Sequence, residues 1–197
     1  MFFKKGVQLM SWVNALTIGW FFGFVLLLVL SQVFELIGIK SEQFILGLAM
    51  GFGVSFAEWQ ALKTKGVSFR WILLCSLGLA LPFLVQSLIG FEFPPSYEYA
   101  VLPIMIGLGS MIVGLTQYTL IRSMNIKIGS SVQFTMMAWL LPVCMINGAS
   151  LIPNDALPKI VLFFINLFAI LAAGPVYAIV KYQLFKTQFG SETTKAE

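Results

Sequence analysis

Six long apolar runs limit the fold of this chain more than any other sequence feature. They cover residues 12–34, 43–62, 69–89, 98–121, 132–151 and 158–181. At about 1.5 Å per helical residue, each run can cross a hydrocarbon core of about 30 Å. Lipid admits only helices and closed barrels, and apolar runs without alternation favour helices. We therefore expect an all-α, polytopic membrane bundle of six transmembrane helices.

Composition and loop lengths support one membrane domain. Charged residues make up 10% of the 197 residues, against about 25% in a soluble domain. We predict a single transmembrane domain over residues 1–187, followed by a polar, flexible cytoplasmic tail over residues 188–197. The first apolar run is longer than that of a signal peptide, so we interpret it as an uncleaved span.

Basic residues are distributed unequally between the two sides of the predicted bundle. One side carries Lys4, Lys5, Lys63, Lys65, Arg70, Arg122, Lys127, Lys181, Lys186 and Lys195. The other side carries Lys40 and Lys159 together with Glu35, Glu42, Glu92, Glu98 and Asp155. Because cytoplasmic loops carry an excess of Lys and Arg, both termini are predicted to be cytoplasmic.

The cytoplasmic ends of the even-numbered spans resemble one another. Trp59, Tyr118 and Tyr177 are spaced by 59 residues, and a basic residue follows each of them four positions later. Glu58, Gln117 and Val176 keep the same interval. The pattern favours three repeated helical hairpins, formed by spans 1–2, 3–4 and 5–6. The alternative is coincidence, since spans draw on few residue types.

Small residues recur every three or four positions in the even-numbered spans. The predicted helix-packing set is Gly47, Gly51, Ser55, Ser110, Gly114, Ala169 and Ala173. This spacing places them on one face of each helix, where small side chains let helices approach closely in lipid. We expect the even spans to turn these faces inward, with the odd spans outside or between them.

Glu58 is the only acidic residue in the interior of a predicted span, since Glu98 is the first residue of its span. Ionisable groups in membranes are costly and usually functional, so Glu58 is a candidate for ion or ligand binding, and we expect Gln117 to be its polar neighbour. The alternative is structural: Glu58 reaches the interface and pairs with Lys63 or Arg122. We favour structural pairing.

Other polar residues inside the spans are uncharged. Asn147 and Asn166 are expected to form interhelical hydrogen bonds, and ligand binding is a secondary possibility. Thr17, Ser76 and Thr135 are expected to bond to carbonyls of their own helices.

Reactive groups are scarce, which disfavours an enzyme. The chain has no histidine, and Cys75 and Cys144 show no metal-binding or redox spacing. We find neither a nucleophile paired with a base nor a phosphate-binding loop. We therefore predict no catalytic residue, no metal and no cofactor. Topology accounts for the net charge of +4, so no nucleic-acid partner is expected.

Residues 51–63, GFGVSFAEWQALK, and 114–122, GLTQYTLIR, carry a resemblance. They resemble the repeated Gly-x-x-Gln-Trp-x-x-Leu-Arg segments of small, uncharacterised bacterial multispanning membrane proteins. The similarity covers mainly the second to fifth spans. Glu58 replaces the usual glutamine, and the third copy lacks the polar residue. The resemblance implies a bacterial inner membrane location and a repeat architecture, and it carries no functional site across.

Two functions remain open from the sequence. The first is a non-enzymatic accessory or scaffold subunit of a larger membrane complex, which contacts the bilayer and either another integral membrane protein or a second copy of itself. The second is a small-molecule transporter or substrate-binding membrane component, with a cavity lined by Glu58, Gln117, Asn147 or Asn166. The two differ in whether these polar groups face a ligand or one another.

Overall fold

The described part of the chain is a bundle of six long helices. The computed structural model describes residues 9–38, 42–90, 93–94, 98–124, 131–153 and 157–189, and none of these lies in a strand. The helices are α1 (Leu9–Leu36), α2 (Glu42–Leu62), α3 (Arg70–Ile89), α4 (Glu98–Arg122), α5 (Ser131–Ser150) and α6 (Lys159–Phe189), with a 3₁₀ turn, η1 (Lys63–Lys65), after α2. All six are long and apolar enough to cross a membrane, which confirms the predicted fold class.

The ends of the helices agree with the predicted spans to within a few residues, except at the end of α6. That helix continues to Phe189, so it includes the first residues of the predicted tail. Residues 190–197 lie outside the described part of the chain. So do several charges used for the orientation, namely Lys4, Lys5, Lys40, Glu92, Lys127, Asp155 and Lys195.

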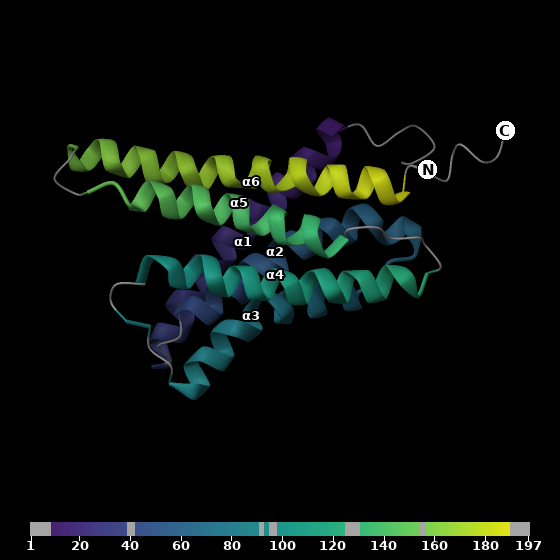
Figure 1. The fold of residues 1–197 in the computed structure, drawn as a ribbon, viewed down its shortest axis with the longest axis horizontal. Helices are drawn as coiled ribbons and strands as arrows, with labels where there is room; N and C mark the ends of the chain where they lie inside the picture. Colours follow the sequence, from purple (N-terminus) through teal and green to yellow (C-terminus); the bar gives the residue numbers. More distant parts are fainter. Residues whose placement is uncertain are drawn as a thin grey trace.

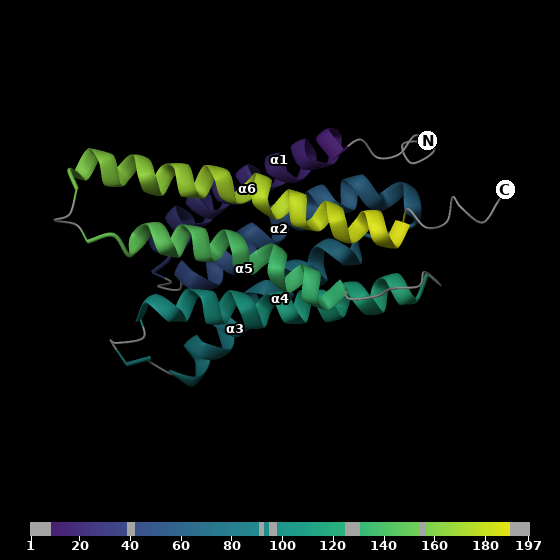
Figure 2. The ribbon, with the colours of Figure 1, turned by 45° about the horizontal axis from the view of Figure 1, so that its top comes forward.

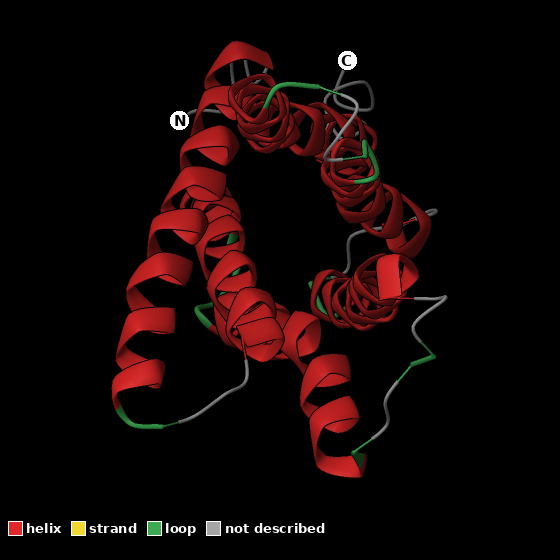
Figure 3. Cartoon of the chain, turned by 90° about the vertical axis from the view of Figure 1, so that its left-hand side faces the viewer, coloured by secondary structure: helices red, strands yellow, loops and turns green. Residues whose placement is uncertain are grey.

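The helices are arranged in a ring. Each helix packs extensively against the helices before and after it in the chain, and α1 packs against α6 to close the ring. Figures 1 and 2 show α4, α5 and α6 running roughly side by side with α1 inclined to them, and Figure 3 shows the ring from one end. The start of α1, the turn at η1 and the end of α6 lie at the same end of the bundle. We call this the basic end, because Lys63, Lys65 and Arg70 are there.

Small residues allow neighbouring helices in the ring to touch through their backbones. A Cβ atom added at Gly47 would lie 2.8 Å from Ala80 Cα, and one at Gly51 would lie 2.9 Å from Ser76 Cα, both in α3. One at Gly114 would lie 2.9 Å from Val132 Cα in α5. These glycines of the even helices therefore face the odd helices, and the expectation that they face inward is wrong for them. The odd helices lie between the even ones, so that is where close approach is needed.

The remaining residues predicted for helix packing are also buried. Ser55 donates a hydrogen bond to the carbonyl of Gly51 at 2.6 Å, and its hydroxyl lies 3.5 Å from that of Ser76 in α3. Ser110 donates to the carbonyl of Gly107 at 2.8 Å. Ala169 and Ala173 are buried as well. The serine hydroxyls bond to nearby carbonyls, so they do not disturb the apolar contacts around them.

A buried ion-pair network inside the ring

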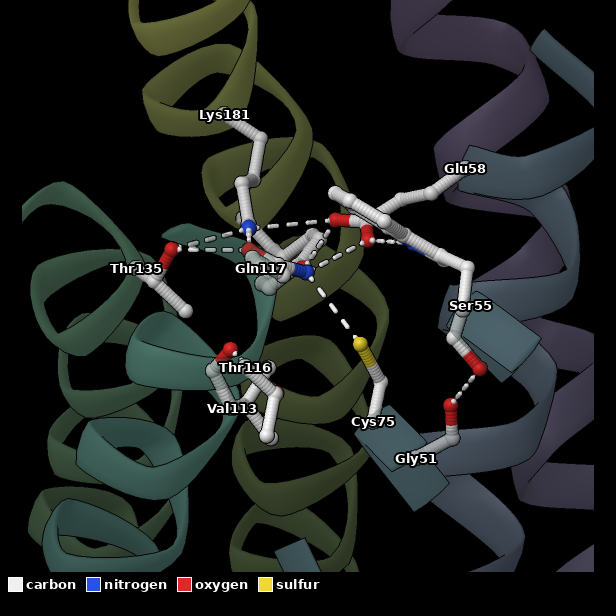
Figure 4. Close-up of polar contacts among 11 residues, drawn as sticks. Gly51, Ser55, Glu58, Cys75, Val113, Thr116, Gln117, Thr135 and Lys181 are labelled. Atoms are coloured by element: carbon white, nitrogen blue, oxygen red, sulfur yellow. Dashed lines mark hydrogen bonds and ion pairs between the residues drawn. The ribbon is translucent and has the colours of Figure 1, made fainter. Parts of the chain in front are cut away.

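The centre of the ring contains two opposite charges near the basic end. Lys181 Nζ of α6 lies 3.3 Å from Glu58 Oε1 of α2. The side chains of the two residues are 0% and 1% exposed, respectively. Isolated charges are expensive to bury, so burial of this pair depends on its mutual attraction and on the surrounding polar groups. Figure 4 shows the two side chains approaching each other across the ring, with Gln117 of α4 beside them.

The carboxylate of Glu58 accepts hydrogen bonds from three further helices. Tyr177 Oη of α6 donates to Oε1 at 2.7 Å. Trp71 Nε1 of α3 and Gln117 Nε2 of α4 each donate to Oε2 at 3.0 Å. Both oxygens therefore have two donors when Lys181 is counted, which satisfies most of the acceptor capacity of a carboxylate.

The ammonium group of Lys181 is also surrounded by hydrogen-bond acceptors. It donates to Gln117 Oε1 at 2.8 Å and to Thr135 Oγ1 of α5 at 3.1 Å, in addition to its contact with Glu58. Thr135 itself donates to Gln117 Oε1 at 3.0 Å. An ammonium has three N–H donors, so three acceptors satisfy it. The Gln117 amide links the two charges, because its oxygen faces the lysine and its nitrogen faces the glutamate.

The network joins helices α2 to α6 into one polar unit. Glu58 lies four residues before the end of α2, and Thr135 four residues after the start of α5. At 1.5 Å per residue this places the unit about 6 Å from the basic ends of those helices. Cys75 of α3 lies at its edge, with its Sγ 3.5 Å from Gln117 Nε2.

Three aromatic rings connect the network to α1. Trp20 of α1, Trp139 of α5 and Tyr177 of α6 have ring centroids 4.9 to 6.1 Å apart. We call them the aromatic triad. Both tryptophans are 3% exposed, and their indole N–H groups have no hydrogen-bond acceptor among the described residues. The aromatic triad therefore contains two buried donors directly next to a satisfied ion pair.

The structure brings together only two of the four predicted polar residues. Glu58 and Gln117 are in contact, as expected. Asn147 lies twelve residues beyond Thr135 on α5, and Asn166 fifteen residues before Lys181 on α6. These separations correspond to about 18 and 22 Å along the helices, so the asparagines are not part of the network. Asn166 donates to the Leu162 carbonyl of its own helix at 3.0 Å.

The prediction that Glu58 pairs with Lys63 or Arg122 is wrong. Lys63 is exposed and donates a hydrogen bond to Gln60, and Arg122 is also exposed. Glu58 instead points into the ring, where Lys181 neutralises it. Thr135 also differs from its prediction, because its hydroxyl bonds to Gln117 and not to a carbonyl of its own helix.

Sequence reasoning missed Lys181, Tyr177, Trp71 and Thr135 as members of the site. A signal was present for two of them. Ala169 and Ala173 define one face of α6, and the same four-residue spacing continues to Tyr177 and Lys181. A lysine on that face is directed into the bundle, unlike a lysine that only flanks a span.

Within the described residues, no group of three or more His, Cys, Asp or Glu side chains is arranged to hold a metal ion. Comparison of the chain with family models, with curated proteins and with solved structures finds no match. The chemistry of the site must therefore be judged from its own geometry. Its two charges are paired, and their hydrogen bonds are directed to other side chains of the network.

Proposed function

We propose that this chain is a non-enzymatic integral membrane protein that serves as an accessory or scaffold subunit of a larger membrane complex. The observation that carries the proposal is the mutual satisfaction of Glu58 and Lys181. Each charge bonds to the other and to neutral side chains of neighbouring helices. Such an arrangement stabilises one packing of the helices, which suits a protein that presents a fixed outer surface.

The composition of the outer surface supports the same proposal. Large apolar side chains are exposed on the outside of α1, α3, α4, α5 and α6, as at Leu77, Leu108, Met137 and Phe168. A partner in the bilayer can pack against such a surface without desolvating any charge. The partner is either another integral membrane protein or a second copy of this chain.

Isolation from native membranes in a mild detergent tests the proposal. We expect the chain to co-purify with another membrane protein, or with itself, in a fixed ratio after chemical cross-linking. Purification in a harsher detergent should separate the components and serves as the control. A chain that runs as a lone monomer in mild detergent, without any cross-linked product, would overturn the proposal.

A small-molecule transporter or substrate-binding membrane component is the second candidate. The indole N–H groups of Trp20 and Trp139 favour it, because they are buried donors without an acceptor in the described part of the chain. A polar solute inside the ring could accept hydrogen bonds from them, next to the charges of Glu58 and Lys181. Buried polar groups of this kind often mark the path of a substrate.

The native cysteine Cys75 distinguishes the two candidates. It is 3% exposed and lies next to Gln117, so its reaction with a small water-soluble thiol reagent reports water access to the network. In a Cys144→Ala background, a scaffold predicts no labelling of Cys75 until the protein is unfolded. A transporter predicts labelling of the folded protein, and Cys75→Ala provides the control for non-specific reaction.

A further inference from the structure

A continuous line of aromatic side chains runs along the outside of α1, α2 and the start of α3. Phe22 contacts Phe52 and Phe56, with ring centroids 6.4 and 6.3 Å apart. Phe52 and Phe56 stack at 6.1 Å. Trp59 continues the line at 6.0 Å from Phe56, and Phe69 ends it at 5.8 Å from Trp59. We call these five residues the aromatic strip.

The aromatic strip is accessible from outside the bundle and has a fixed shape. Phe22 and Phe69 are 46% and 52% exposed, and the other three rings are half-buried. Trp59 Nε1 donates a hydrogen bond to the Val67 carbonyl at 3.2 Å, which fixes the indole at the basic end. The strip is therefore a preformed apolar surface and not a set of independent side chains.

Positive charge lies where the aromatic strip meets the basic end. The ammonium of Lys63 lies 5.5 Å from the centroid of the Trp59 ring, and Arg70 directly follows Phe69. Both basic side chains are exposed. The nearest acidic residue in sequence, Glu58, is buried and paired with Lys181. Glu58 is the only acidic residue in the segment 43–90, so no other acidic group of that segment opposes these cations.

The dimensions fit one leaflet of a bilayer. Phe52 and Lys63 are separated by eleven residues, which is about 16 Å along a helix. Half of a hydrocarbon core of about 30 Å has nearly the same thickness. An acyl chain lying on the strip would therefore place its headgroup at the level of Lys63 and Arg70.

We infer that the aromatic strip, together with Lys63 and Arg70, forms a binding site for an anionic phospholipid. The rings contact one acyl chain, and the two cations contact the phosphate-containing headgroup. Arg pairs well with phosphate oxygens in a bidentate geometry, and Lys adds a point charge. A zwitterionic lipid would contact the same rings with its acyl chain. Its headgroup would be attracted less strongly to the two cations, because its own positive group is repelled by them.

Tryptophan fluorescence provides a direct measurement. Trp12, Trp20, Trp71 and Trp139 are at most 3% exposed, whereas Trp59 is half-buried on the strip. A lipid with brominated acyl chains quenches tryptophans that it touches, so quenching in liposomes reports contact at Trp59. At equal mole fraction, we expect brominated phosphatidylglycerol to quench at least twofold more strongly than brominated phosphatidylcholine. Trp59→Phe should remove the difference.

Matched variants test the role of the charges. Lys63→Gln combined with Arg70→Gln should bring quenching by the two lipids to the same level, while quenching by phosphatidylcholine stays as it was. Lys159→Gln removes an exposed cation at the other end of the bundle and should leave the preference unchanged. Equal quenching of the unmodified protein by both lipids, or a preference that survives the double substitution, would overturn the inference.

Discussion

Glu58 and Lys181 each make the burial of the other tolerable. Loss of one partner leaves an uncompensated buried charge, which costs about 3–5 kcal/mol in buried pairs of this kind. Loss of both charges removes the attraction together with the desolvation penalty. The two residues must therefore be considered as a unit. A single substitution measures mainly the free-energy cost of the unpaired charge that remains.

A double-mutant cycle tests this coupling. We expect Glu58→Gln and Lys181→Met each to lower the free energy of unfolding by about 3–5 kcal/mol, and the double variant to lose clearly less than the sum. The measurement is unfolding by titration with a denaturing detergent. Lys63→Met is the control, because Lys63 is exposed and its loss should change stability by less than about 0.5 kcal/mol. Strictly additive losses would contradict the coupling.

At the same scale, the sequence could identify only half of the ion pair. Glu58 stands out because an acidic residue inside a span has few structural explanations, and Gln117 follows from the shared interval. Lys181 does not stand out, because a lysine after an aromatic residue at the end of a span is typical of any cytoplasmic flank. Whether that lysine points outward or inward depends on the rotation of α6, which its packing against α1 and α5 decides.

At the scale of elements, α1 and α2 form the closest backbone contact described. A Cβ atom added at Gly53 would lie 2.6 Å from the carbonyl oxygen of Gly19. Gly19 would in turn bring a Cβ within 2.8 Å of the Gly53 carbonyl oxygen. Both neighbours are backbone atoms, which cannot move aside as a flexible side chain can. A methyl group at either position therefore requires the two helices to separate.

Gly53→Ala should lower stability for this reason. We expect a loss of about 1–3 kcal/mol, the usual range for overpacking a well-filled contact. Gly148→Ala is a matched control, since a Cβ added there meets nothing within 4 Å. Alanine is the better helix former by up to about 1 kcal/mol, so this control should be neutral or stabilising. Retention of the folded peak in size-exclusion chromatography after heating ranks the two variants.

The existence of the helices was readable from hydropathy because the bilayer requires long apolar segments. The faces they present were harder to assign. Gly47 and Gly51 were correctly expected on one face of α2, but the pattern does not say which neighbour that face meets. The partner is α3, the next helix in the chain. Small residues on a helix face predict a close contact with another helix, but they do not identify that helix.

For the whole molecule, we propose that the basic end faces the cytoplasm. The described charges Lys63, Lys65, Arg70 and Arg122 support this orientation. Single cysteines introduced in a Cys144→Ala background can test it with a membrane-impermeant maleimide. Thr64→Cys and Ser123→Cys should be labelled only after the cells are broken, whereas Leu151→Cys should be labelled in intact cells. The background protein alone controls for reaction at Cys75, and labelling of Thr64→Cys and Ser123→Cys from opposite sides would exclude the topology.

The ring also has a consequence for how the chain is made. Glu58 belongs to the second helix to be synthesised, whereas the hydroxyl of Tyr177 that bonds to it comes 119 residues later in the sequence. At about 5–20 residues per second, several seconds of translation separate them. During that interval the carboxylate is inserted without its cation and without the phenol. Lys181 and Tyr177 reach Glu58 only with the last helix, so a prematurely terminated polypeptide lacks both of these partners.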